Sequence, residues 1–116
     1  MEPITSKETV QQVINQFVDK EVFIHLETTN GAYATHNDKD FLNAGCFIRN
    51  AKINYSIGKI VGDGPFRVGL KLDFGWVYGE GITHYEVDEL GRLLMAGHDS
   101  SGKLAIAFEI SETPFE

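Results

Sequence analysis

Apolar and polar residues alternate along most of this chain, which is the two-residue period of half-buried β-strands. Residues 66–72 (FRVGLKL) are the clearest example, because every second side chain there is a large apolar one. The segment 73–75 (DFG) then predicts a three-residue hairpin loop. On the return strand, Trp76 and Tyr78 share one face. This hairpin is the centre around which we expect the other strands to be arranged.

Strand-like segments continue on both sides of the hairpin. The further segments with extended patterns are residues 22–27, 32–36, 46–53, 59–61, 82–87 and 104–110. In residues 22–27 the apolar positions are 22, 24 and 26, so positions 23, 25 and 27 face the other way. In residues 104–110 the even positions form an inward face. The small side chains of Ala105 and Ala107 lie opposite, which predicts that this second face is also covered, by the helix described below.

Turn-forming residues separate these segments. Glycines 79 and 81 predict a bulge or bend before residues 82–87. The predicted turns and loops are Asn30-Gly31 (a type I′ hairpin), residues 37–43 (a long loop), 56–59, 62–65, 88–92 and 99–103. Strands at this spacing, with glycine-containing turns between them, are typical of antiparallel sheets that curl into a barrel or a sandwich.

One amphipathic helix is predicted near the start of the chain, over residues 5–19. Thr5 and Glu8 have the spacing of a capping box. The apolar residues 10, 13, 14, 17 and 18 recur at helical spacing and form one stripe. We therefore predict a mainly β (α+β) fold over residues 1–116 as a single domain, with the N-terminal helix packed on a curled antiparallel meander sheet.

Composition and charge exclude several classes of function. The chain has 116 residues and a formal net charge of −7, without a run of basic residues. Nucleic acid and anionic membranes are therefore not expected partners, because both require concentrated positive charge. Cys46 is the single cysteine, so no internal disulfide can form, and we predict a cytoplasmic protein in which Cys46 is a small buried side chain. Neither a signal peptide nor a membrane-spanning run is evident.

Two His-x-Glu pairs are the first candidates for chemistry. His25 with Glu27, and His84 with Glu86, each present an imidazole and a carboxylate on one face of a predicted strand. Such a pair can hold a proton or contribute to a metal site. Cross-strand hydrogen bonding on a half-exposed sheet face explains them as well, and we favour that interpretation. The four histidines lack the paired spacing of zinc ligands, so we expect no stoichiometric metal and no other cofactor.

A second candidate is a set of polar and aromatic residues that sheet geometry can gather on one face. Its members are Arg49, Asn50, Arg67, Lys71, Trp76, Tyr78 and His84. Arginines interleaved with aromatic rings can hold a small anion or a sugar-like ligand. The alternative is a solvated sheet face. The candidate ligand-binding residues from both sets are His25, Glu27, Arg49, Arg67, Trp76, His84 and Glu86.

Several segments in order resemble one family over nearly the whole chain. They are residues 25–33 (HLETTNGAY), 47–52 (FIRNAK), 64–72 (GPFRVGLKL), 75–81 (GWVYGEG), 96–99 (AGHD) and 109–115 (EISETPF). On these segments the chain resembles the YojF family of small bacterial proteins, which offers no catalytic motif to transfer. The resemblance also implies an accessory role beside a deacetylase of bacillithiol synthesis, a zinc enzyme of a different fold.

Two hypotheses for the function follow. The first is a non-enzymatic accessory or binding protein, because the sequence shows no assembled catalytic constellation. The second is a small-molecule enzyme or ligand-binding module that uses a His/Glu/Arg site on a sheet face. Proline interrupts none of the predicted strands between Cys46 and Ile110, so the sheet edges lack that form of protection. Closure of the sheet, a homodimer or a protein partner is expected to cover them.

Overall fold

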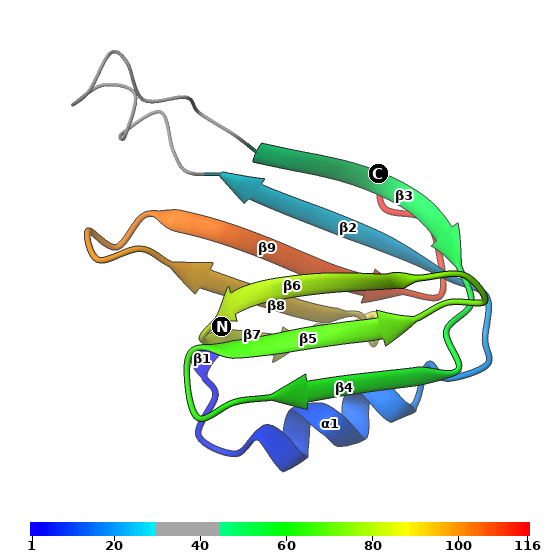
Figure 1. Cartoon of the computed structure of the whole chain (residues 1–116), viewed down its shortest axis with the longest axis horizontal. Helices are drawn as coiled ribbons and strands as arrows, with labels where there is room; N and C mark the ends of the chain where they lie inside the picture. The colour runs from blue at the N-terminus through cyan, green and yellow to red at the C-terminus, as the bar shows by residue number, and fades with distance from the viewer. Residues whose placement is uncertain (30–44) are drawn as a thin grey trace.

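Two antiparallel sheets and one helix make up the fold in the computed structural model, which describes residues 1–29 and 45–116 (Figure 1). The six-stranded sheet has the order β1-β7-β8-β9-β2-β3 and the three-stranded sheet the order β4-β5-β6. The elements are β1 Glu2–Pro3, α1 Lys7–Asn15, β2 Val22–Thr29, β3 Gly45–Ile53, β4 Ile57–Val61, β5 Phe66–Lys71, β6 Trp76–Ile82, β7 His84–Val87, β8 Leu93–His98 and β9 Leu104–Ser111. Neither sheet closes on itself, so the arrangement is a sandwich and not a barrel.

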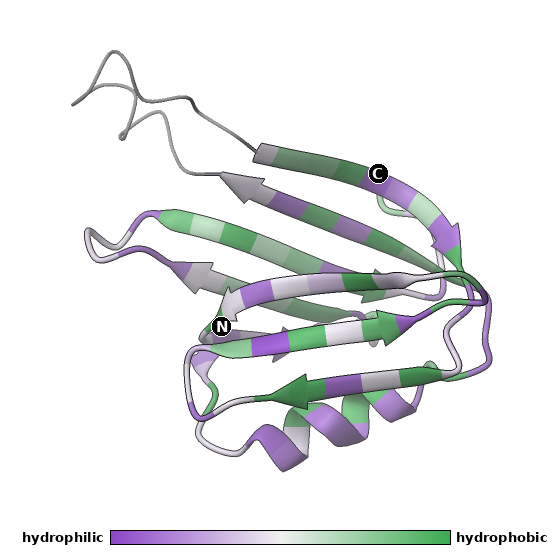
Figure 2. Ribbon diagram, in the orientation of Figure 1, coloured by the Kyte–Doolittle hydropathy of each residue, from purple (hydrophilic) through white to green (hydrophobic). Residues whose placement is uncertain are grey.

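The core lies between the two sheets. Val68 and Leu70 on β5 and Phe108 and Ile110 on β9 are buried at predicted inward positions, whereas Leu104, at the start of β9, is exposed. Apolar positions alternate with polar ones along β5 (Figure 2). The predicted mainly β fold and its alternation are thus confirmed. The predicted strand 32–36, the Asn30-Gly31 turn and the loop 37–43 lie outside the described residues.

The chain changes sheets at a corner that the sequence pattern did not indicate. We predicted one extended segment over residues 82–87, but β6 ends at Ile82 and β7 begins at His84 in the other sheet. The expected bulge is present at Gly81, which has a φ of 83° and is the extra residue between the pairs Phe66–Ile82 and Arg67–Glu80. A β-carbon on Gly97 would lie 1.8 Å from the Gly81 carbonyl oxygen. The two sheets therefore meet closely at this corner, and glycine is required there.

The helix is shorter than predicted and begins differently. It covers Lys7–Asn15, nine residues, and the N-cap is Ser6 and not Thr5. The chain leaves the helix through turns to Asp19, whose φ is 61° and whose N–H donates to the Tyr55 carbonyl oxygen at 2.9 Å. The apolar stripe is nevertheless confirmed, because Val10, Ile14 and Phe17 are buried. Its continuation past Asn15 made the helix look longer in the sequence than it is.

The helix lies beside β4, along the edge of the three-stranded sheet (Figure 1). It therefore does not cover Ala105 and Ala107, contrary to the prediction. The Gln11 amide donates to the Gly58 carbonyl oxygen at 2.7 Å and accepts from the Ile60 N–H at 3.0 Å. The helix thus supplies β4 with hydrogen bonds that a neighbouring strand would otherwise make.

Residues 56–59, which we predicted as a turn, are mostly strand. Only Ser56 precedes β4, and Gly58 lies at its second position. A β-carbon on Gly58 would lie 2.4 Å from Ile14 Cγ2, so this glycine allows the helix to approach the strand. The glycine was taken as a turn signal, but the position needs it for close packing.

The two acidic hairpin loops, 88–92 and 99–103, are confirmed. In each, the aspartate N–H donates to the carbonyl oxygen four residues later, at 3.1 Å and 2.8 Å. Gly91 and Gly102 have φ values of 76° and 84°, which explains the glycine at that position. In the described residues, helix α1 is the one helix, and it is too short to cross a membrane.

Cys46 is exposed and not buried as predicted. It lies on β3, the last strand of the six-stranded sheet, and pairs with Thr28 of β2. The three-stranded sheet packs through β6 against β8 and β9, and β3 lies beyond it (Figure 1). Ile48, on the same inward side of β3, is partly buried against the core. Among the described residues, the cover is therefore lost only toward the Gly45 end of β3, which the alternation of the strand cannot reveal.

Candidate functional site

The outer face of the three-stranded sheet is the most distinctive surface of the described residues. Strand register places the outward side chains of β4, β5 and β6 in three parallel rows. These rows are Ile57–Lys71–Trp76, Lys59–Gly69–Tyr78 and Val61–Arg67–Glu80. We call the side chains of Ile57, Lys59, Val61, Arg67, Lys71, Trp76 and Tyr78 the aromatic face.

Two stacked rings form the centre of the aromatic face. The Trp76 and Tyr78 ring centroids are 5.4 Å apart and the ring planes differ by 7°. Tyr78 lies flat over β5 because Gly69 has no side chain, and a β-carbon there would be 2.7 Å from the tyrosine ring. The Arg67 guanidinium lies 5.2 Å from the Tyr78 ring centroid and pairs with Glu80. Arg67, Tyr78 and Trp76 thus form a fixed ladder of planar groups.

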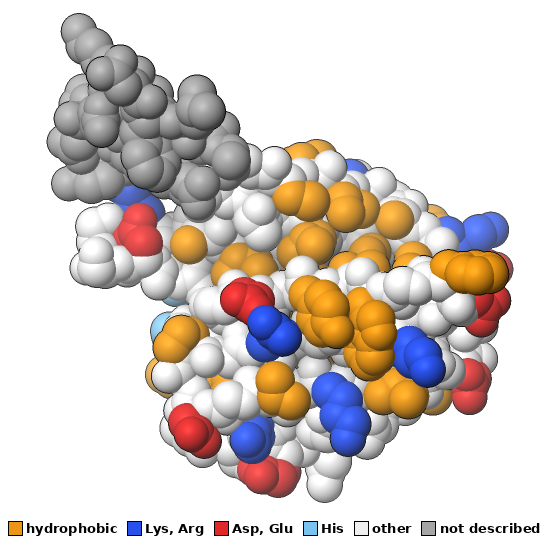
Figure 3. All heavy atoms as spheres, in the orientation of Figure 1, with side chains coloured by type: hydrophobic (Ala, Val, Ile, Leu, Met, Phe, Trp, Pro, Cys, Tyr) orange, Lys and Arg blue, Asp and Glu red, His pale blue; other side chains and the backbone are white. Residues whose placement is uncertain are grey.

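The aromatic face is exposed, apolar and positively charged. Trp76, Tyr78, Ile57 and Val61 retain 40–48% of their accessible surface. In Figure 3, apolar and basic side chains gather over this sheet, and a hollow of about 210 Å³ lies between Lys59, Arg67, Trp76 and their neighbours. Neither Lys59 nor Lys71 forms an ion pair with another described residue. On a chain with a net charge of −7, this face is a local concentration of positive charge.

The outer face of the six-stranded sheet carries the other predicted residues, in two rows across the strands. One row is Glu86–Leu94–Glu109–His25–Arg49, and the next is His84–Ala96–Ala107–Glu27–Phe47. The two His-x-Glu pairs therefore share one face, as the spacing predicted. They are three strands apart, or roughly 14 Å, and Leu94, Ala96, Ala107 and Glu109 lie between them.

His25 and Glu27 contact each other at one end of this face. His25 Nε2 lies 3.2 Å from a Glu27 carboxylate oxygen. The imidazole packs edge-on against Phe47 and Phe115, with centroid distances of 5.4 and 6.4 Å. Its Nδ1 is buried and has no hydrogen-bond partner among the described residues. This arrangement can hold a proton, but His25 as a whole retains only 7% of its accessible surface.

The C-terminal segment covers His25 because β3 carries a clamp for it. Asn50 is a bulged residue with a φ of 60°, and its amide bonds both the N–H and the carbonyl oxygen of Phe115, at 2.7 and 2.6 Å. The guanidinium groups of Arg49 and Arg92 lie 5.1 and 5.5 Å from the Phe115 ring centroid. Arg49 also donates to the Glu116 carbonyl oxygen. Arg49 and Asn50 thus hold the chain's own segment in this structure.

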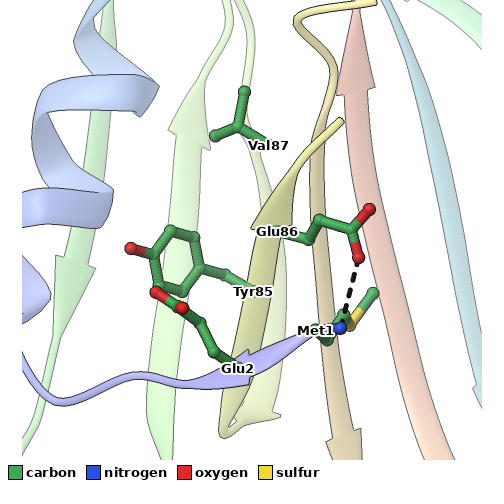
Figure 4. Close-up of a pocket in the computed structure, with 5 residues that line it drawn as sticks. All are labelled: Met1, Glu2, Tyr85, Glu86 and Val87. Atoms are coloured by element: carbon green, nitrogen blue, oxygen red, sulfur yellow. Dashed lines mark ion pairs between the residues drawn. The ribbon is translucent and has the colours of Figure 1, made fainter. Parts of the chain in front are cut away.

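His84 and Glu86 lie apart from that cluster, near the start of the chain. His84 stacks edge-on with His98 at 5.2 Å, and its Nδ1 is 2.7 Å from the Thr83 hydroxyl. Glu86 pairs with the amino group of Met1 at 3.2 Å, beside a hollow of about 470 Å³ that Tyr85 also lines (Figure 4). Partial burial and a hydrogen bond to Glu2 raise the pKa of Tyr85. Among the described residues, no three His, Cys, Asp or Glu side chains are grouped to hold a metal ion.

The seven predicted candidate residues therefore fall on two faces. Arg67 and Trp76 belong to the aromatic face, and the other five belong to the six-stranded sheet in two separate groups. Sequence reasoning missed Ile57, Lys59 and Val61 as members of this face, because residues 56–59 resemble a turn and leave only a short extended segment at 59–61. Their alternation with Gly58 and the buried Ile60 is the signal that could have identified them.

Comparisons with known proteins place the chain in a family. Residues 3–115 match the family described as "Protein of unknown function (DUF1806)". The chain is 53% identical over 109 residues to the uncharacterized protein YojF of Bacillus subtilis (strain 168), and the match covers 94% of each chain. The crystal structure of Bacillus subtilis YojF is similar with a TM-score of 0.83 and 50% identity, covering 99% of this chain and 96% of that one. The chain therefore belongs to the YojF family of proteins of unknown function.

Proposed function

We propose that the chain is a non-enzymatic accessory protein that binds a partner protein through its aromatic face. One observation carries this proposal. The stacked rings of Trp76 and Tyr78 are exposed beside two lysines that form no ion pair among the described residues. An exposed aromatic cluster of this kind is costly to leave in water and marks an interaction site.

The composition of the face is that of a binding surface. Tryptophan, tyrosine and arginine supply most of the energetically dominant contacts in protein interfaces. Here the rings are already fixed against Gly69 and Arg67, so little side-chain entropy is lost on binding. Ile57 and Val61 flank the rings and extend the apolar area.

The charge of the face selects the kind of partner. Lys59 and Lys71 attract an acidic surface, whereas the rest of this acidic chain repels one. Complementary charge of this kind raises association rates and fixes orientation. Nucleic acid fits less well, because a net charge of −7 opposes the approach of a polyanion. We therefore infer a protein partner with an acidic rim around an apolar centre.

The first partner to test is the deacetylase of bacillithiol synthesis that the family resemblance implies. The experiment is titration of that deacetylase with this protein, read by native mass spectrometry and by deacetylase turnover. We expect a complex at micromolar concentrations. Trp76→Ala is expected to weaken it about 30-fold, since truncating a central aromatic costs about 2 kcal/mol. Lys71→Glu is expected to weaken it about tenfold and to reduce its salt dependence.

Lys20→Glu is the matched control, because Lys20 is an exposed lysine that pairs with Glu112 away from the aromatic face. It should leave the affinity within about twofold. If the protein changes neither the mass nor the turnover of the deacetylase, that partner is wrong. If a complex forms but Trp76→Ala leaves it intact, the aromatic face is not the binding surface.

The second candidate function is a small-molecule site around His25, Glu27 and Arg49. The observation in its favour is the buried His25 Nδ1, which has no partner among the described residues. Phe115 packs against the imidazole, so a ligand would have to displace the C-terminal segment. This candidate becomes the leading one if the deacetylase titration shows no complex.

A further inference from the structure

Strand β3 ends the six-stranded sheet, and its outer edge is not covered by any residue that the structure describes. It pairs with β2 on one side, and no described strand pairs with its other side. The remaining sheet edges are short, bent or occupied. β1 has two residues, β6 contains the Gly81 bulge, and Gln11 bonds the backbone of β4. β3 has nine residues and is regular from Gly45 to Arg49, before the bulge at Asn50.

We propose that this protein forms a two-fold dimer in which β3 pairs antiparallel with β3 of a second copy, around an axis through Phe47. The two six-stranded sheets would then join into one continuous sheet. A two-fold axis perpendicular to a sheet keeps each side chain on its own face, and facing residues in a strand pair point to the same side. The axis must therefore pass through a residue that meets its own copy. The regular stretch Gly45–Arg49 has Phe47 at its centre.

The side chains suit this register. Phe47 retains 68% of its accessible surface, and in the dimer it lies beside the Phe47 ring of the second copy. Arg49 faces Gly45 of the second copy, so no like charges meet across the axis. On the inner face, Cys46 faces Ile48 of the second copy. Cys46 is exposed and Ile48 is partly buried against the core, and pairing removes the apolar surface that each still exposes from water.

The devices that normally block edge pairing are missing from this stretch. Proline and inward-pointing charges are the usual ones, and residues 45–49 (GCFIR) contain neither. Arg49 is the single charge, and it is directed toward Phe115 and Glu116 of its own chain. The edge therefore presents an exposed ring and backbone groups that no described strand pairs with. A second copy supplies an identical partner at the same concentration.

The test is the mass of the protein in solution, measured by native mass spectrometry and sedimentation at about 50 µM. We expect a dimer for the natural sequence. Phe47→Asp places two carboxylates opposite each other and is expected to raise the dissociation constant at least tenfold. Leu90→Asp is the matched control, because Leu90 retains 69% of its surface and lies in the 88–92 loop away from β3; it should leave the dimer intact. Thermal melts verify that both variants fold.

Cys46 provides an independent measurement, because it is the single cysteine of the chain. In this register the two Cys46 side chains are diagonal neighbours with β-carbons about 7–8 Å apart. A short bis-maleimide should therefore link two natural chains, and should not link the Phe47→Asp chains. A monomer at 50 µM, a dimer that survives Phe47→Asp, or a dimer that the reagent does not link would each overturn the proposal. The last two results would place the contact on another surface.

Discussion

Two sheet edges in this molecule are treated in opposite ways. The β4 edge is covered by helix α1, whose Gln11 amide bonds the strand backbone at Gly58 and Ile60. On β3, Asn50 holds the C-terminal segment. This segment covers part of the outer face of the sheet, but among the described residues nothing pairs with the free edge of the strand. Neither strand contains proline, so the sequence alone gives no reason to expect one edge to be better protected from pairing than the other. The two edges differ in their neighbours: helix α1 lies beside β4, whereas no described element lies beside the outer edge of β3.

The comparison shows how an edge can be protected without changing the strand itself. Gln11 is 47 residues from Gly58 in the chain, and it imitates the peptide group of a neighbouring strand. Gly58 allows the helix to approach, because a β-carbon there would meet Ile14. Protection of β4 thus depends on the docking of α1. The absence of a comparable cover on β3 among the described residues is the reason to expect a second copy there.

Loosening the packing of helix α1 is expected to have the largest effect on stability. Phe17 retains 4% of its surface and follows α1 directly. Phe17→Ala is expected to lower the free energy of unfolding by about 3–5 kcal/mol, because it leaves a cavity in the core. Denaturant melts measure the loss, and Gln16→Ala, at an exposed neighbour, should stay within about 0.5 kcal/mol. A loss below about 1 kcal/mol would show that the helix is not firmly packed and does not seal β4.

Tyr55 joins the helix to the start of β4 and gives a smaller effect with a pH signature. Its buried hydroxyl donates to the Ile14 carbonyl oxygen at 2.6 Å, and Tyr55→Phe is expected to cost about 2 kcal/mol. Burial raises the pKa of Tyr55 above its ordinary value. The unfolded chain therefore releases this proton first, and stability falls as the pH rises above about 10.

Melts at pH 8 to 11 check this effect. Tyr55→Phe should show a shallower decline at high pH than the natural sequence, since the ionising group is gone. Phe74→Leu serves as the control, because Phe74 is almost fully exposed and carries no ionisable group, so this change should leave the slope unchanged. Parallel slopes for Tyr55→Phe and the natural protein would contradict the assignment of the high-pH loss to Tyr55.

Removal of the Gln11 amide is expected to have the smallest effect on stability, but it tests directly whether this side chain protects the β4 edge. Gln11→Ala removes both hydrogen bonds to β4 and should cost about 1 kcal/mol. It should also convert β4 into an open edge, so that species larger than the natural assembly appear in light scattering. Gln12→Ala, at the exposed neighbouring position, should change neither quantity. If Gln11→Ala leaves the mass distribution unchanged, packing of the helix alone is enough to cover the edge.

The sequence determined the local structure of this protein well. The two-residue period placed strands such as β5 and β9 and their buried faces, because alternation records which side of a strand meets water. The hairpin loops at 88–92 and 99–103 followed from aspartate and glycine, whose backbone preferences act within a few residues. The apolar stripe of the helix was also correct. The predicted ends of the helix were wrong. The predicted turn at residues 56–59 was also wrong, because Gly58 allows close packing of the helix and does not form a turn.

Only the tertiary structure decided how these elements meet. The extended pattern across residues 82–87 gave no sign that the chain passes from one sheet to the other after Ile82. The two His-x-Glu pairs share a face, yet two intervening strands keep them apart. Cys46 lies on the inward side of β3 and is nevertheless exposed. Alternation specifies the face of a residue and carries no information about which strand lies beside it, because that neighbour is chosen by packing between segments far apart in the chain.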